Sequence, residues 1–271
     1  MKRCAFFSGL FVLLTCGSAI GQPEVVERLE KSPRHHEFVD IDAPGDRKVH
    51  TWVVYPEVNH PATTVIVIHE NRGLTDWVRG VADQLAEAGF VAIAPDLLSG
   101  TAPGGGNTPE FGSEDAARTG IGKLPQAQVT ADLDAVYEYA KNLPAGNKVV
   151  AVGGFCWGGG QTFAYAAHNP NIAAACVFYG SAPRDEAAYN NIKTPVHGFF
   201  GGNDFRITGD VPNVAKRMKQ LGKTFEPVVY ENAGHGFMRQ GEATTDASNP
   251  DRKARDEAWE RWKNLLSELK P

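Results

Sequence analysis

Short, nearly uninterrupted runs of β-branched residues recur along this chain, and segments with helical spacing follow them. The clearest run, residues 63–69, reads Thr-Thr-Val-Ile-Val-Ile-His, and residues 75–88 after it carry one apolar face, formed by Val78, Val81, Leu85 and Ala88. A run that is apolar on both faces is typical of a strand buried in a parallel sheet. Strands that alternate with helices predict an α/β protein with a mainly parallel central sheet and helices on both faces.

The same pattern continues to the end of the chain. Further strands are predicted at residues 38–41, 49–55, 90–94, 148–153, 172–179, 195–200 and 225–230. Further helices are predicted at residues 129–140, 161–167, 211–221 and 254–269. No internal repeat and no break in composition divides these segments, so we expect residues 22–271 to form one domain.

One long segment, residues 99–125, has no clear period and contains three consecutive glycines. A loop of this length inside a compact domain is usually functional or disordered. We expect this segment to be a flap over a site at the carboxyl ends of the strands.

Residues 1–21 have the three parts of a secretory signal peptide. Lys2 and Arg3 precede an apolar run at residues 5–14, and small residues follow it up to Gly21. The run is shorter than the roughly 20 residues that a membrane span needs. We therefore expect cleavage after Gly21 and export of the remaining chain.

Two other interpretations of this leader are less favoured. Cleavage after Ala19 would use a small residue slightly earlier in the chain, and a lipid anchor at Cys16 would have Thr15 before the cysteine, which fits a lipoprotein motif poorly. No later segment is long and apolar enough to span a bilayer. We expect a periplasmic or extracellular protein without a membrane span.

Charge and cysteine content narrow the function classes further. The chain has 27 Lys and Arg against 32 Asp and Glu, a net charge of −5, which becomes −7 when the two basic residues of the leader are removed. An acidic chain without a Lys/Arg-rich run lacks the basic surface of a nucleic-acid-binding protein. Two of the four cysteines lie in the leader, which leaves Cys156 and Cys176. Cys176 lies in a predicted buried strand, so we expect no disulfide between them.

Residues 149–159 read Val-Val-Ala-Val-Gly-Gly-Phe-Cys-Trp-Gly-Gly. They predict a strand, a tight turn and a helix start with the G-x-nucleophile-x-G pattern of a nucleophile elbow, in which Cys156 takes the place of serine. At a helix N-terminus the dipole favours a thiolate. Cys156 is therefore a candidate nucleophile, and the alternative is a structural cysteine in a glycine-rich turn.

Two further predicted strands deliver the residues that would complete a catalytic triad. Asp204 follows the strand at residues 195–200, and His235 lies in a loop between two glycines after the strand at residues 225–230. Known triads of this type have the nucleophile first along the chain, then the acid, then the histidine. His235 would accept the thiol proton, and Asp204 would orient the imidazole and support its positive charge.

With these residues the sequence resembles the dienelactone hydrolase family of the α/β-hydrolase fold, over roughly residues 37–270. The resemblance implies a carboxymethylenebutenolidase-like hydrolase of carboxylic esters or lactones, with Cys156 as nucleophile, His235 as base and Asp204 as the orienting acid. It also implies that Glu70 lies beside the thiol and takes part in switching its ionisation. Four segments carry the resemblance: residues 69–74 (His-Glu-Asn-Arg-Gly-Leu), 154–159, 202–204 and 234–237.

The chemistry expected of this site is acyl transfer through a thioester. Cys156 would attack a carbonyl carbon and form a tetrahedral oxyanion, which needs two hydrogen-bond donors. We expect the backbone N–H of Trp157 to be one donor and Asn71 to supply the second. Glu70 has an alternative interpretation as a strand-end carboxylate that pairs with Arg72.

Arginines suggest how a substrate would be held. The resemblance implies arginines that bind a substrate carboxylate, and Arg239, four residues after His235, matches one such position. Where the family pattern has another arginine, after residues 95–97, this chain has Ser-Gly-Thr at residues 99–101. This departure argues against dienelactone itself and favours another ester or lactone with a good leaving group. The other candidates for substrate contact are Arg72 and Phe237, with Arg118 and Arg206 as arginines that could compensate.

We expect no metal and no cofactor. The eight histidines show no zinc-like spacing with acidic partners, and no glycine-rich phosphate motif with a following lysine is present. The expected partner is a small-molecule ester or lactone, and the sequence leaves the oligomeric state open. Three alternatives stay open: a non-catalytic secreted binding protein on the hydrolase scaffold, a thioesterase and a sugar-ester esterase.

Overall fold

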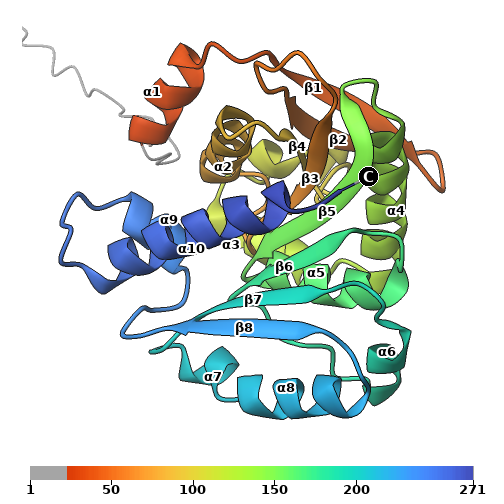
Figure 1. Cartoon of the computed structure of the whole chain (residues 1–271). Helices are drawn as coiled ribbons and strands as arrows, with labels where there is room; N and C mark the ends of the chain where they lie inside the picture. Colours follow the sequence, from red (N-terminus) through yellow and green to blue (C-terminus); the bar gives the residue numbers. More distant parts are fainter. Residues whose placement is uncertain (1–22, 271) are drawn as a thin grey trace, which may run out of the picture.

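The structure is a computed structural model that describes residues 23–270 (Figure 1). The predicted signal peptide at residues 1–21, with its candidate cleavage positions and the candidate lipid anchor at Cys16, lies outside the described residues.

Eight strands form one sheet in the order β1-β2-β4-β3-β5-β6-β7-β8. β1 pairs antiparallel with β2, and β2 with β4, while every other neighbouring pair is parallel. The mainly parallel sheet predicted from the β-branched runs is therefore confirmed. The strands are β1 (His36–Ala43), β2 (Arg47–Val54), β3 (Ala62–Ile68), β4 (Val91–Pro95), β5 (Gly146–Phe155), β6 (Ala174–Phe178), β7 (Val196–Gly201) and β8 (Phe225–Tyr230).

Ten α-helices and two short 3-10 helices lie in the described part of the chain. The five predicted helices are present as α2 (Asp76–Glu87), α4 (Gln126–Asn142), α5 (Trp157–His168), α8 (Val211–Gln220) and α10 (Pro250–Ser267). Those not predicted are α1 (Pro23–Lys31), α3 (Glu114–Ile121), α6 (Glu186–Asn191), α7 (Phe205–Thr208), α9 (Phe237–Glu242), η1 (Pro103–Gly105) and η2 (Thr108–Phe111). All of these are short, so few turns carry the 3.6-residue period that would reveal them.

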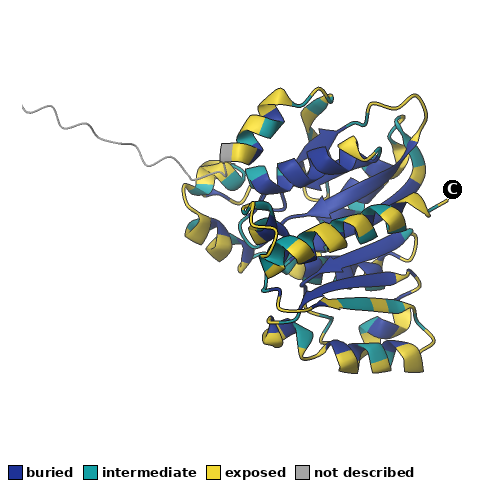
Figure 2. Cartoon of the chain, turned by 60° about the vertical axis from the view of Figure 1, so that its left-hand side comes forward, coloured by how far each residue is buried: buried dark blue, intermediate teal, exposed yellow. Residues whose placement is uncertain are grey.

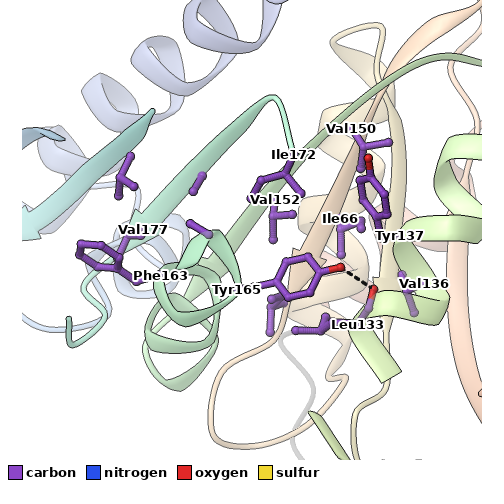
Figure 3. Packing of buried hydrophobic residues seen from close by; sticks show 14 of the residues in the cluster. Ile66, Leu133, Val136, Tyr137, Val150, Val152, Phe163, Tyr165, Ile172 and Val177 are labelled. Atoms are coloured by element: carbon purple, nitrogen blue, oxygen red, sulfur yellow. Dashed lines mark hydrogen bonds between the residues drawn. The ribbon is translucent and has the colours of Figure 1, made fainter. Parts of the chain in front are cut away.

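Alternate side chains of the central strands enter two apolar cores, one on each face of the sheet. Along β3, Ile66 and Ile68 join the core covered by α4, α5, α6 and α8, while Val65 and Val67 join the core covered by α2, α9 and α10. Figure 2 shows the central strands buried and the outer faces of the helices exposed. In the first core the hydroxyl of Tyr165 donates to the carbonyl of Leu133 at 3.2 Å (Figure 3).

Trp262 of α10 supports the strand that leads into the nucleophile turn. It is fully buried, and its ring meets Phe155 at 5.8 Å and Phe178 at 4.8 Å between centroids. Trp262→Ala would leave a large cavity behind β5, so we expect the free energy of unfolding to fall by about 3–5 kcal/mol. Urea unfolding measures this loss. Trp259 lies on the partly buried side of the same helix, so Trp259→Ala should lower the free energy of unfolding clearly less. Equal losses in the two variants would contradict the assignment of Trp262 to the core.

The segment of residues 99–125, described above as a loop without a clear period, contains η1, η2 and α3. Buried Asp96 anchors it: its Oδ2 accepts from the Thr108 N–H at 2.7 Å, and its Oδ1 accepts from the Thr108 hydroxyl at 2.8 Å. Ile121 of α3 packs in a small separate core with Leu98. These contacts join residues that are distant in sequence, and no local period announces them.

Candidate active site

Cys156 lies at the turn between β5 and α5, as the N-cap residue of α5, with φ 56° and ψ −113°. A positive φ is uncommon for a residue with a side chain and is held only where the surroundings fix it. Here the Cys156 N–H donates to the carbonyl of Phe178 at 3.0 Å, and its carbonyl accepts from the Gly160 N–H at 3.2 Å. The predicted strand, tight turn and helix start are therefore present, with the cysteine at the strained position.

The two glycines of the G-x-C-x-G pattern allow three backbone segments to approach closely. A Cβ on Gly154 would lie 2.3 Å from the carbonyl oxygen of Gly158. A Cβ on Gly158 would lie 2.3 Å from the carbonyl oxygen of His69, which follows β3. No larger residue fits at either position, so the pattern brings the start of α5 against the segment that carries Glu70 and Asn71.

His235 bridges Cys156 and Asp204. Its Nε2 lies 3.1 Å from the Sγ atom of Cys156, and its Nδ1 lies 2.6 Å from Oδ2 of Asp204. Asp204 is buried at the end of β7, and the ring edge of Tyr179 packs against the imidazole with 5.1 Å between centroids. The fold thus brings together the three residues that the sequence offered as nucleophile, base and orienting acid.

The electrostatics of this group favour a protonated imidazole. The hydrogen bond with Cys156 raises the pKa of His235 to about 9, burial opposes this shift, and Asp204 adds to it. An unperturbed histidine has a pKa of about 6.5, so His235 carries a positive charge at neutral pH. A neighbouring imidazolium is a general device for stabilising a thiolate, which is the reactive form of cysteine.

This raised pKa predicts how stability depends on pH. Folded His235 holds its proton more tightly than the unfolded chain does, so this group stabilises the fold below about pH 6.5, and its contribution is lost as the pH rises toward 9. The variant His235→Gln lacks this contribution to stability. The difference in unfolding free energy between wild type and His235→Gln should therefore shrink between pH 6 and pH 9.5 in urea unfolding experiments. A difference that stays constant or grows would contradict the raised pKa.

Trp157 and Asn71, the predicted oxyanion donors, both border the cavity at Cys156. Trp157 is the first residue of α5, so its backbone N–H has no partner within the helix. Trp157 and Asn71 line the same cavity as Cys156 and His235. Both residues are therefore exposed to the space that a substrate at Cys156 would enter.

Glu70 has a different partner from the one suggested by the sequence. Its buried carboxylate accepts a hydrogen bond from Nε of Arg239 on α9 at 3.0 Å. Arg72, the alternative partner, pairs instead with Glu114 of α3 at 2.8 Å. The interpretation of Glu70 as a carboxylate paired with Arg72 is therefore wrong.

The relation of Glu70 to the thiol is indirect. In the part of the chain that the structure describes, no hydrogen bond joins Glu70 to the Cys156 sulfur, whose partner is His235. Burial raises the pKa of Tyr179 well above its usual value, and the charges of Glu70 and Cys156 raise it further. Both groups therefore lie close to the Tyr179 phenol.

Tyr179 is a site residue that the sequence analysis missed. It directly follows β6, has a φ of 39°, and is fully buried. It lines the cavity at Cys156, and its hydroxyl has no hydrogen-bond partner among residues 23–270. The available signal was its position, since it ends a strand that neighbours the nucleophile strand, at the same edge of the sheet as Cys156.

A cavity of about 700 Å³ opens at Cys156 and His235. Arg118, Ile121 and Gly122 form part of its wall, so the segment of residues 99–125 does border the site. Among the described residues the cavity lining includes no Asp or Glu, and its cationic side chains are Arg118, Arg184, Arg206 and the protonated His235. The cavity therefore carries positive charge without a fixed acidic counterpart in its wall.

The three predicted substrate-binding residues do not line this cavity. Phe237 is fully buried and packs against the rings of Tyr179 at 5.3 Å and Tyr230 at 5.2 Å. Arg239 and Arg72 are held by the ion pairs described above. The arginines that could compensate, Arg118 and Arg206, do line it.

The described residues offer neither a metal site nor a membrane span. No three His, Cys, Asp or Glu side chains there are grouped to hold a metal ion, and none of the helices is long and apolar enough to cross a membrane. Cys156 and Cys176 are both free. Burial raises the pKa of Cys176 to about 12, which keeps this second thiol protonated and unreactive.

Comparison with known proteins identifies the family of the chain. Residues 49–270 match the profile of the dienelactone hydrolase family. The chain is 33% identical over 205 residues to a protein of Methylorubrum extorquens AM1 named "Putative carboxymethylenebutenolidase", with 71% of this chain and 69% of the relative covered. It is 30% identical over 211 residues to a protein of the same name from Escherichia coli K12, with 74% and 76% covered.

A solved structure of a similar protein points to the same family. The fold is similar to the crystal structure named "Putative Dienelactone Hydrolase" from Klebsiella pneumoniae, with a TM-score of 0.75 and 28% identity, over 87% of this chain and 99% of that chain. The chain therefore belongs to the dienelactone hydrolase family and is a hydrolase of the α/β-hydrolase fold.

Proposed function

We propose that this protein hydrolyses carboxylic esters or lactones with Cys156 as nucleophile, His235 as base and Asp204 as the residue that orients the imidazole. The observation that carries the proposal is the bridging position of His235, 3.1 Å from the sulfur and 2.6 Å from the carboxylate, at the base of an open cavity. These distances are those of a hydrogen-bonded nucleophile and base with an oriented base.

In the first half of the reaction, Sγ of Cys156 attacks the carbonyl carbon while His235 holds the thiol proton. The backbone N–H groups of Trp157 and Asn71 stabilise the tetrahedral oxyanion. The intermediate collapses, the carbon–oxygen bond of the ester breaks, and the leaving alcohol takes the proton from His235. A thioester remains on Cys156.

In the second half, water replaces the alcohol. His235 takes a proton from this water, and the resulting hydroxide attacks the thioester carbon. Collapse of the second tetrahedral intermediate breaks the carbon–sulfur bond and releases the carboxylic acid. The proton on His235 then restores the starting pair of sulfur and imidazole.

A panel of activated esters, enol lactones, thioesters and acetylated sugars tests this proposal. We expect turnover of activated esters and enol lactones. Preference for thioesters or sugar esters would favour the thioesterase or sugar-ester esterase alternative, since all share acyl transfer. The absence of turnover on every member would favour a non-catalytic binding protein, although such a protein has no need of the arrangement of Asp204 and His235.

We also propose that the protein is exported. The support is the charged start, short apolar run and small-residue end of residues 1–21, together with the start of α1 at Pro23, so that cleavage after Gly21 leaves every described helix and strand intact. N-terminal sequencing of the protein from the periplasm or medium should begin at Gln22. A chain that keeps Met1 and remains in the cytoplasm would contradict export.

A further inference from the structure

A second, smaller cavity of about 150 Å³ opens beside the cavity at Cys156. The two cavities have five lining residues in common, which are Ser181, Ala182, Arg184, Arg206 and Ile207. Because these residues line both spaces, the two cavities are neighbours that share one wall.

The inner wall of the smaller cavity is apolar. It is formed by Phe163 of α5, Phe200 of β7, Phe225 of β8, and Val211 and Val214 of α8. All of them except Phe225 are buried core residues, and Phe225 packs against that core. An apolar cavity of this volume accommodates a group of the size of benzene. The space therefore fits one aromatic ring or an apolar group of similar size.

The mouth of the smaller cavity is cationic. Arg184 and Arg206 make no ion pair and no side-chain hydrogen bond within residues 23–270, unlike Arg118, which pairs with Asp115 at 2.6 Å. Asp210 also lines the smaller cavity, and its carboxylate accepts from the Asn213 amide at 3.1 Å. Because a guanidinium group matches the geometry of a carboxylate, these two free arginines are suited to an anionic group at the mouth.

We propose that the smaller cavity and its two arginines form a substrate subsite, which we call the side pocket. The side pocket would hold one ring-sized apolar group of the substrate, and Arg184 and Arg206 would bind an anionic group next to that ring. This inference rests on the proposed function, because the ester bond of the same molecule is held at Cys156. It assigns the substrates to anionic esters or lactones that carry one ring, recognised without Arg239, whose guanidinium is paired with Glu70.

Four small probes separate the two recognition elements. 3-Phenylpropanoate has both ring and charge, 3-phenylpropan-1-ol has only the ring, butanoate has only the charge, and butan-1-ol has neither. NMR titration of the purified protein gives the dissociation constants. We expect 3-phenylpropanoate to bind about tenfold more tightly than butanoate, because its ring is buried. We expect it to bind at least about threefold more tightly than 3-phenylpropan-1-ol, because its carboxylate meets the arginines.

Two variants test the side pocket, one for the arginines and one for the apolar space. Arg206→Gln should remove most of the advantage of 3-phenylpropanoate over 3-phenylpropan-1-ol and keep the advantage of the ring. Ala182→Phe, at the shared wall, should fill the entrance and remove the advantage of the ring. Lys219→Gln, an exposed charge change on α8 outside both cavities, is the matched control and should leave all four constants unchanged.

The outcomes distinguish the side pocket from the proposed function. Hydrolysis of vinyl acetate, which is neutral and has no ring, is measured separately on the same protein. Equal binding of the four probes, or loss of binding in Lys219→Gln as large as in Arg206→Gln, would overturn the side pocket even if vinyl acetate is cleaved. The expected order of binding without any cleavage would support the side pocket as a ligand site and overturn the hydrolytic function.

Discussion

Cys156→Ala is expected to lower kcat for activated esters by at least about 10⁴-fold. The Sγ atom is the only protein atom in the proposed mechanism that bonds to the substrate carbon. Its removal also takes away the hydrogen-bond partner of His235 at 3.1 Å. The residual rate would come from the oxyanion donors and the bound geometry alone. The loss is measured from initial rates on an activated ester, divided by the concentration of folded protein.

Cys176→Ala provides the matched control for this prediction. Cys176 is free like Cys156, but it is fully buried in β6 and does not line the active-site cavity. We expect its replacement to leave kcat within about twofold, since surface and core changes away from a site act mainly on stability. Equal losses in the two variants, or a Cys156→Ala protein that retains a tenth of the wild-type kcat, would contradict the role of Cys156.

Asp204→Asn should lower kcat by about 10³–10⁴-fold with little change in KM. The carboxylate accepts a hydrogen bond from Nδ1 of His235 at 2.6 Å, which leaves Nε2 free to accept the thiol proton. An amide in this place favours the other imidazole tautomer and no longer supports a positive charge. Steady-state kinetics together with urea unfolding separate this effect from a loss of folding.

Asn203→Ala, one residue earlier, is the control for the Asp204 variant. Asn203 is exposed, and its side chain donates to the backbone carbonyl of Asn232 at 3.0 Å. Its removal perturbs the same loop without touching His235, so we expect a change in kcat of less than about threefold. A loss in Asp204→Asn of less than tenfold, or one matched by Asn203→Ala, would show that the carboxylate has only a structural role.

The parts of the fold that the sequence predicts are those whose signal is local. β3 is recognisable because residues 63–68 are apolar or β-branched on both faces, and the structure buries the whole strand. The turn at Cys156 is predictable because the G-x-C-x-G pattern lies within five consecutive residues, although the steric need for Gly158 comes from the distant carbonyl of His69. His235 and Asp204 could be identified because parallel strands end at one edge of a sheet, so that order along the chain becomes proximity in space.

The parts that the sequence does not predict depend on contacts between distant segments. Nothing near Glu70 indicates that its partner is Arg239, 169 residues later, and not Arg72, two residues away. Phe237 belongs to the histidine motif, yet its ring is directed into the core. Helix α3 forms because its apolar side packs on Leu98 and because Asp96 anchors the preceding loop. In each case tertiary packing decides between options that are locally equivalent.

If Cys156 carries the acyl group during turnover, this thioester can be trapped on the protein. The protein is mixed with an activated ester, quenched with acid within the first turnovers, digested, and analysed by mass spectrometry. We predict that the peptide containing Cys156 gains the mass of the acyl group, that hydroxylamine removes it as expected for a thioester, and that Cys156→Ala shows no such adduct. Ester turnover with the acyl group on another residue, or with no adduct on Cys156 during a burst of released alcohol, would contradict the account.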